Sequence, residues 1–80
     1  MTTLQEYLNN LENKDQIKEI NLEKINQERT DQGTTELLEG GELDLSQFTN
    51  LERVAIEPKL LKTPLVKINV QGLTNLQELI

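Results

Sequence analysis

The chain of 80 residues contains no cysteine, no histidine and no tryptophan. Without cysteine it can form neither disulfide bonds nor thiolate metal sites. Without histidine it also lacks the usual general base of enzymes and a principal zinc ligand. These absences exclude thiol nucleophiles and ordinary zinc sites, and we expect no metal and no cofactor.

Catalytic residues are equally scarce. Ser46 is the only serine, and nothing in the sequence suits activation of its hydroxyl, so it is interpreted as a turn residue. Glu36, Glu39 and Glu42 lie close together in a glycine-containing segment. Acid–base catalysis or cation binding requires desolvated or convergent oxygens, which so polar a segment does not supply. No catalytic residue is assigned, and the chain is predicted not to be an enzyme.

Basic residues are fewer than acidic residues. Eight lysines and arginines stand against fourteen acidic residues, which gives a net charge of −6. Only Lys59, Lys62 and Lys67 gather in one segment, whereas phosphate binding needs a strong positive surface. We therefore expect no nucleic-acid partner. An acidic inhibitor of a basic protein is a lesser alternative, although the acidic residues form no continuous run.

Long hydrophobic runs are absent from the start of the chain. The first twenty residues carry six charges and no apolar run, so they predict neither a signal peptide nor a membrane span. No membrane partner is expected, and the cytoplasm is the default location. With 35% hydrophobic and 28% charged residues, the composition is typical of a folded chain, and the length suits one small domain.

The N-terminal segment has the pattern of an amphipathic helix. Leu4, Leu8 and Leu11, together with Tyr7, share one helical face. Thr3 followed by Glu6 fits a capping box at the helix start. The pattern predicts a helix over residues 3–12 within a helical cap that spans residues 1–13.

A different spacing follows this segment. Ile17, Ile20 and Leu22 are arranged as IxxIxL, in which β-branched residues alternate with charged ones as in a half-buried strand. This predicts a first strand unit over residues 17–25. Residues 26–41 are polar and contain three of the four glycines, and they are predicted to form a polar loop with a short turn near residues 36–39.

The IxxIxL spacing recurs four times, and its copies begin 23, 11, 14 and 11 residues after one another. The steps of 11 and 14 define a unit of 25, so residues 43–55 align with residues 68–80 and "TNL" recurs in the same apolar phase. A period near 25 is the length of a short solenoid repeat. Residues 42–80 are thus predicted to be a repeat region, truncated in its last copy. Its apolar positions are Leu43, Leu45, Phe48, Leu51, Val54, Ile56, Leu65, Ile68, Val70, Leu73, Leu76 and Leu79.

Two further features divide the repeat region. Asn50 and Asn75, in the repeated Thr-Asn steps, are predicted to stabilise turns through side-chain hydrogen bonds to the turning backbone. Pro58 cannot donate to a sheet ladder, so the strand that ends at Ile56 is expected to stop there.

The segment "LERVAIEPKLL" (residues 51–61) resembles the leucine-rich repeat LxxLxLxxNxL, with Lys59 where that family usually has asparagine. The stretch "LEGGELDLSQFTNLERV" is similar to first repeats of the family, apart from one extra glycine. The resemblance implies stacked short parallel strands whose first open end is covered by a helix. Because Lys59 lacks the amide, two forms stay open: a regular curved solenoid, and a compact, flattened variant with strands on two faces. The predicted fold class is α+β and β-dominated: a short leucine-rich-repeat-like solenoid with an N-terminal helix cap and short parallel strands.

The resemblance implies a non-catalytic protein–protein interaction module, or the N-terminal part of a longer repeat protein, with an unidentified protein partner. The alternative is a structural element that self-associates through its uncapped C-terminal end. The final "NLQELI" presents Leu76, Leu79 and Ile80 without a following turn to cover them, and an exposed apolar edge is a template for pairing. This alternative predicts a homo-oligomer joined at the C-terminal edge.

Overall fold

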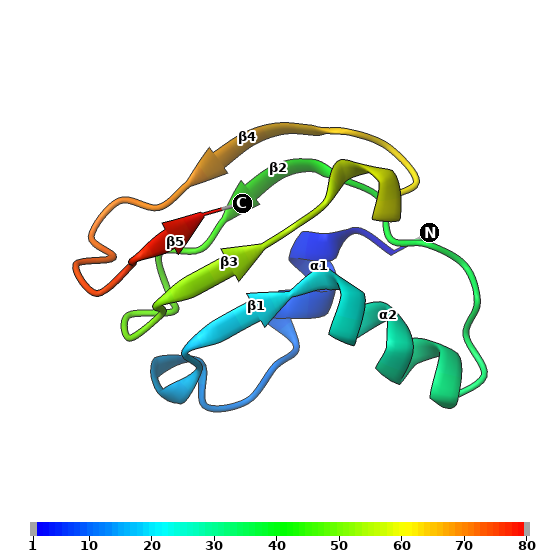
Figure 1. The fold of residues 1–80 in the computed structure, drawn as a ribbon, viewed down its shortest axis with the longest axis horizontal. Helices are drawn as coiled ribbons and strands as arrows, with labels where there is room; N and C mark the ends of the chain where they lie inside the picture. Colours follow the sequence, from blue (N-terminus) through cyan, green and yellow to red (C-terminus); the bar gives the residue numbers. More distant parts are fainter. Residues whose placement is uncertain (1, 80) are drawn as a thin grey trace.

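The computed structural model describes residues 2–79 as a small α+β fold of short elements (Figure 1). Ile80, part of the expected uncapped end, lies outside the described residues. The helices are α1 (Leu4–Asn9), η1 (Lys14–Gln16, 3₁₀), α2 (Leu22–Asp31) and η2 (Pro58–Leu60, 3₁₀). The strands are β1 (Glu19–Asn21), β2 (Gly41–Asp44), β3 (Arg53–Ala55), β4 (Leu65–Asn69) and β5 (Glu78–Leu79).

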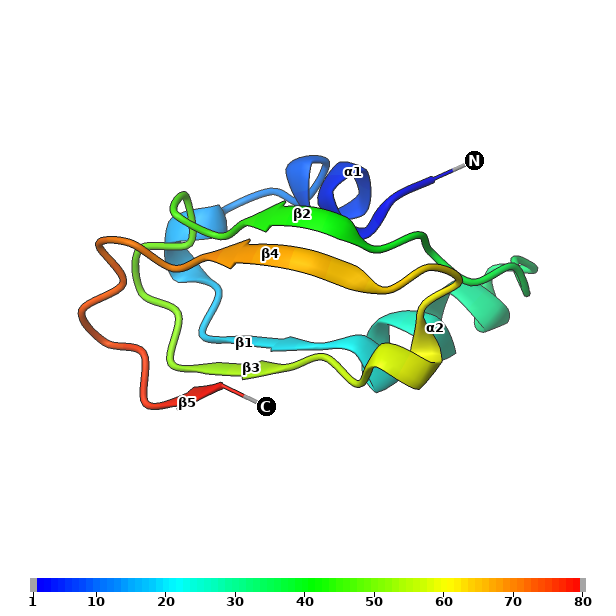
Figure 2. The same cartoon turned by 90° about the horizontal axis from the view of Figure 1, so that it is seen from above.

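The strands form two separate parallel sheets. One has the order β1-β3-β5, and the other pairs β2 with β4. Figure 2 shows the two sheets as two layers, with α1 beside β2, and in Figure 1 the arrows of one sheet run opposite to those of the other. The prediction of an α+β fold with short parallel strands is thus confirmed.

The 25-residue period of the sequence equals the separation along the chain between residues that pair across neighbouring strands. Leu43 is opposite Ile68 in the β2–β4 pair, and Val54 is opposite Leu79 in the β3–β5 pair. Both steps are 25 residues, although the pairs belong to different sheets. We call residues 42–55 repeat A and residues 67–79 repeat B. Repeat B therefore lies directly beside repeat A in both sheets.

The turns of the two repeats also match. The N–H of Phe48 donates to the Leu45 carbonyl at 3.0 Å, and the N–H of Leu73 donates to the Val70 carbonyl at 3.2 Å. One step later the Leu51 and Leu76 amides make the equivalent bonds at 3.0 and 3.2 Å. The prediction that the two "TNL" steps follow the same turn is confirmed.

The hydrophobic core lies between the two sheets and extends beneath α1 and α2. Gly40 shows how closely the backbones approach, because a Cβ there would lie 2.4 Å from the carbonyl oxygen of Thr63. Only glycine fits where β2 begins. The buried apolar residues are Leu4, Leu8, Ile20, Leu22, Ile25, Leu38, Leu43, Leu45, Phe48, Leu51, Val54, Ile56, Leu61 and Leu73.

The prediction of a strand unit over residues 17–25 and a polar loop over 26–41 was wrong in part. The strand ends at Asn21, and α2 occupies residues 22–31. The Asn21 Oδ1 accepts the N–H groups of Glu23 and Lys24 at 3.0 and 3.3 Å, which caps the helix. Gly33, at φ +93°, follows its end. The helix buries only Leu22 and Ile25, so its apolar periodicity was too short to be recognised.

Two smaller differences concern the helical cap and the loop. α1 ends at Asn9, short of the expected residue 12, and Asn13 adopts a left-handed conformation (φ 56°) before η1. The Thr3 hydroxyl accepts the Glu6 N–H at 3.1 Å, as the capping pattern predicted. Leu38, assigned to the polar loop, is completely buried, and its carbonyl accepts the Lys62 N–H at 2.8 Å.

The equivalent leucines of the two repeats should differ in their contribution to stability. Leu51 is 0% exposed, whereas Leu76 is only partly buried. We expect Leu51→Ala to lower the free energy of unfolding by about 2–5 kcal/mol, the range for buried leucines, and Leu76→Ala by about 1 kcal/mol, because much less apolar surface is lost. Urea denaturation followed by circular dichroism measures both. Equal losses would show that repeat B is buried as fully as repeat A.

Candidate functional site

The outer edges on the two sides of the strand pairs are covered to different extents. At one end, α1 lies beside β2 (Figure 2), and the Leu4 N–H donates to the carbonyl of Glu39, two residues before β2, at 2.8 Å. At the other end, β4 and β5 are the last strands of their sheets. Within residues 2–79, no further strand pairs with the outer edge of β4 or of β5. We call these two strand edges the open edge.

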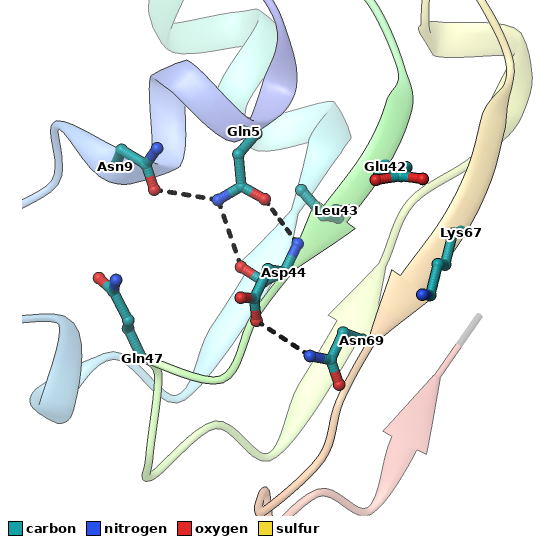
Figure 3. A pocket seen from close by; sticks show the side chains of 8 residues that line it. All are labelled: Gln5, Asn9, Glu42, Leu43, Asp44, Gln47, Lys67 and Asn69. Atoms are coloured by element: carbon teal, nitrogen blue, oxygen red, sulfur yellow. Dashed lines mark hydrogen bonds between the residues drawn. The ribbon is translucent and has the colours of Figure 1, made fainter.

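Gln5 closes the β2 edge with its side-chain amide. The Asp44 N–H donates to Gln5 Oε1 at 2.5 Å, and Gln5 Nε2 donates to the Asp44 carbonyl at 3.2 Å (Figure 3). The amide thus makes both hydrogen bonds, one donated and one accepted, that the backbone of a neighbouring strand would make with Asp44. A second bond from Nε2 to the Asn9 Oδ1, at 3.0 Å, holds the side chain in place. At Asp44, the outer edge of β2 is therefore closed to a further strand.

A shallow polar cleft of about 510 Å³ lies between α1 and the outer face of β2 and β4 (Figure 3). Most of its hydrogen-bonding groups already bond one another: Gln5 bonds the Asp44 backbone, and Asn69 Nδ2 donates to Asp44 Oδ1 at 3.5 Å. Its walls offer neither an aromatic surface nor an enclosed apolar volume for a ligand. The residues that line it are Gln5, Asn9, Glu42, Leu43, Asp44, Gln47, Lys67 and Asn69.

Asp44 and Asn69 end β2 and β4 with the same turn. The Asp44 Oδ1 accepts the Ser46 N–H at 2.9 Å, and the Asn69 Oδ1 accepts the Gln71 N–H at 3.0 Å. The side-chain and backbone hydrogen bonds from Ser46 lower the pKa of the Asp44 carboxyl below its usual value of 3.8. Ser46 is therefore a turn residue, as predicted, and its partner is a structural carboxylate.

The two predicted turn asparagines lie in turns, but their side chains do not bond their own turns. Asn50 Nδ2 donates to the Asp15 carbonyl at 2.6 Å, and Asn75 Nδ2 donates to the Asn50 Oδ1 at 3.4 Å. The expectation that each asparagine side chain bonds the backbone of its own turn was wrong. Each side chain instead reaches the preceding layer: Asn50 reaches Asp15, and Asn75 reaches Asn50. These amides form a ladder that runs from η1 through repeat A to repeat B.

Burial falls from repeat A to repeat B at every equivalent apolar position. Leu43, Leu45 and Leu51 of repeat A are buried, whereas Ile68, Val70 and Leu76 of repeat B are only partly buried. At the last pair, Val54 is 0% and Leu79 is 51% exposed. Phe48, Ile56 and Leu73 are also buried, and Leu65 is partly buried. The predicted repeat residues thus form the core in repeat A, whereas in repeat B only Leu73 is buried, three residues are partly covered and Leu79 is exposed.

Val66 adds to this surface and was missed by the sequence prediction. It is 78% exposed and lies at an irregularity in which Gly41 pairs with Leu65 while Glu42 pairs with Lys67. β4 therefore contains one extra residue, a bulge. Bulges are common at sheet edges, but the sequence has no signal that distinguishes Val66 from the neighbouring strand residues.

The groups considered for catalysis or charge-based binding are dispersed. Among residues 2–79, no cluster of three or more acidic residues is placed to hold a metal ion. Glu36 instead accepts a hydrogen bond from Lys62 Nζ at 3.3 Å, and Lys59 Nζ lies 3.3 Å from the Glu57 carboxylate. The three lysines of residues 59–67 therefore lie near acidic partners, since Lys67 is opposite Glu42. They do not form an isolated positive surface.

A second, more apolar groove of about 210 Å³ lies beside β1, between α1 and α2. Tyr7 lies in its wall, and burial raises the pKa of the Tyr7 hydroxyl, with a further increase from the negative charge and hydrogen bond of Glu28. Tyr7 of α1 and Glu28 of α2 thus lie together in the wall of this groove.

Comparisons with known proteins found no matching protein family, no matching curated protein and no matching solved structure. In the part of the chain that the structure describes, no helix combines the length and apolar character needed to cross a membrane.

Gln5→Glu should weaken the closure of the β2 edge. The carboxylate can still accept the Asp44 N–H but cannot donate to the Asp44 carbonyl, so we expect a loss of about 1–2 kcal/mol in the free energy of unfolding and faster hydrogen exchange of the Asp44 amide. Gln47→Glu adds the same charge to the same cleft at an exposed position and is the control. Equal effects of the two variants would contradict the role of the amide.

The pKa of Asp44 should respond to Ser46. Because its folded pKa is below the ordinary value, the carboxylate stabilises the folded state above that value, and this contribution is lost as pH falls through the folded pKa. Ser46→Ala removes the hydroxyl bond and retains the N–H bond, so the pKa should rise part of the way towards 3.8. An NMR titration of the carboxyl carbon measures it, with Ser46→Thr as the control. An unchanged pKa in Ser46→Ala would contradict this assignment.

Proposed function

We propose that the chain is a non-catalytic protein-interaction module of leucine-rich-repeat type, which binds another polypeptide at its open edge. The observation that carries this proposal is the uncovered surface of repeat B. All five apolar positions of repeat A are buried, whereas four of the five equivalent positions in repeat B, all except Leu73, are partly buried or exposed. Within residues 2–79, no further strand pairs with the outer edge of β4 or β5. A partner that supplies one more pair of strands would bury this surface.

A polypeptide strand matches the chemistry of the open edge. The outer edges of β4 and β5 carry backbone N–H and C=O groups that need partners of the same kind. The apolar side chains of Val66, Ile68 and Leu79 are uncovered or partly covered beside them. Strand addition uses these two features together, since backbone bonds supply affinity and side chains supply specificity. A small polar ligand would use neither.

The leucine-rich-repeat assignment is supported by the 25-residue register and by the helix that closes one end. The chain differs from the leucine-rich-repeat pattern at Lys59, which lies in η2 and forms an ion pair with Glu57. The amide ladder of Asn50 and Asn75 links neighbouring repeats at a different turn. Side-chain amides therefore hold these layers together, although they do not occupy the asparagine position of the family pattern.

The same surface makes self-association a second candidate. Two copies could meet at their open edges and cover each other's Val66 and Leu79. Longer assemblies by head-to-tail stacking are disfavoured, because α1 and Gln5 occupy the β2 edge that an incoming open edge would need. Self-association would then stop at a pair of chains.

Substitution at the open edge should remove partner binding while the fold is retained. In an affinity experiment with immobilised protein at micromolar concentration, Leu79→Glu should lose the proteins that the unmodified chain retains, because a charge at the centre of the contact is costly to desolvate. Leu37→Glu places the same charge on another exposed leucine (39% exposed, compared with 51% for Leu79) and should retain them. Equal retention by both variants, or no specific protein retained by the unmodified chain, would overturn the proposal.

A further inference from the structure

Charge alternates from strand to strand in both sheets. In the β2–β4 pair, Glu42 is opposite Lys67. In the other sheet, Glu19, Arg53 and Glu78 are consecutive neighbours across β1, β3 and β5. The Arg53 Nε lies 3.8 Å from the Glu78 carboxylate. At these positions, each strand therefore has a neighbour of opposite charge.

Such alternation restricts which strand can be added next. Opposite charges directly across two strands stabilise the pairing, and like charges destabilise it. Lys67 and Glu78 are the outermost members of their two ladders and are exposed. A strand added to β4 therefore needs an acidic residue opposite Lys67, and a strand added to β5 needs a basic residue opposite Glu78.

We propose that the open edge selects a partner whose two strands carry an acidic residue and, eleven residues later, a basic residue. This inference rests on the proposed function and names the chemistry of its partner. The spacing follows from the chain itself, because Glu42 and Arg53, which face Lys67 and Glu78 from the inner side, are eleven residues apart. The partner has the charge signature of repeat A.

Polar contacts beside the charges support the same arrangement. Asn69 Nδ2 donates to Asp44 Oδ1 at 3.5 Å, and Asn75 Nδ2 donates to Asn50 Oδ1 at 3.4 Å. Each contact joins a residue of repeat B to the residue 25 positions earlier. A strand pair of the repeat A type brings amide or carboxylate groups to the outer side of Asn69 and Asn75 at the same register.

A second copy of the chain does not meet these requirements in a parallel stack. Its repeat A has the required charges, but Gln5 and β4 occupy the two edges of its β2 strand. If its repeat B paired with the open edge in the same register, Lys67 would face Lys67 and Glu78 would face Glu78. The charges of the open edge therefore favour strands other than those of a second copy as the occupant.

A peptide with the sequence of residues 41–56 is a suitable probe, because it contains Glu42 and Arg53 at the native spacing. Titrated into the isotope-labelled full-length chain, it should shift the NMR signals of β4 and β5. A peptide with Glu42→Lys and Arg53→Glu should bind about three- to tenfold more weakly, as expected for two reversed cross-strand pairs. The protein variant Lys67→Glu/Glu78→Arg should reverse this preference.

The control is Lys59→Glu/Glu57→Arg, which exchanges the charges of an exposed ion pair outside the open edge and should leave the preference unchanged. Thermal unfolding monitored by circular dichroism verifies that both double variants fold. A reversed preference in the Lys67/Glu78 variant alone supports the inference. Equal binding of both peptides at β4 and β5 would overturn the charge selection and leave the proposed function intact.

Two other outcomes are also decisive. If neither peptide binds and sedimentation shows a dimer that Leu79→Glu dissociates, the occupant is a second copy and the inference is overturned. If neither peptide binds and the chain stays monomeric, with no protein retained in the affinity experiment, the proposed function fails together with the inference.

Discussion

The structure depends on the burial of one repeat by the next. A strand pair of this kind is only a few residues long and cannot cover its own apolar side chains, so each layer needs neighbours on both sides. Repeat A has such neighbours, namely β1 and α1 on one side and repeat B on the other, and Leu45, Leu51 and Val54 are completely buried as a result. In a domain of 80 residues, which buries a modest fraction of its surface, this central layer supplies much of the core.

The same constraint makes the two ends structurally different. At the α1 end, Gln5 satisfies both backbone groups of Asp44, and the helix leucines Leu4 and Leu8 cover the apolar side chains beneath. At the open edge, the outer backbone groups of β4 and β5, several apolar side chains and one charge in each sheet face no further strand within residues 2–79. In the proposed interaction module, specificity would follow from the register and charge order that already join the layers of the chain.

Much of the fold could be predicted because the repeat is encoded locally. The apolar phase shared by residues 43–55 and 68–80 fixes which residues face the core, and a shift by one residue would turn each of them to solvent. The steps of 23 and 11 residues that separate Ile17 from Leu51 likewise reappear as the 34-residue register between β1 and β3. α2 was not recognised, since two buried residues, Leu22 and Ile25, are too few to distinguish a helix from a strand. Leu38 was missed because its burial depends on the segment at Lys62, far away in the chain.

The sequence by itself therefore determined the period, the core positions of repeat A, the turns at both "TNL" steps and the absence of histidine and cysteine chemistry. These properties depend on neighbouring residues, whose spacing and identity are visible in a single strand or turn. Only the tertiary structure decided that Gln5 closes the β2 edge, that Asn50 and Asn75 bond each other, and that Lys67 and Glu78 end two alternating charge ladders. Those relations join residues 25 or more positions apart, and hydrogen bonds and ion pairs act over a few ångströms, so they exist only once the strands lie side by side.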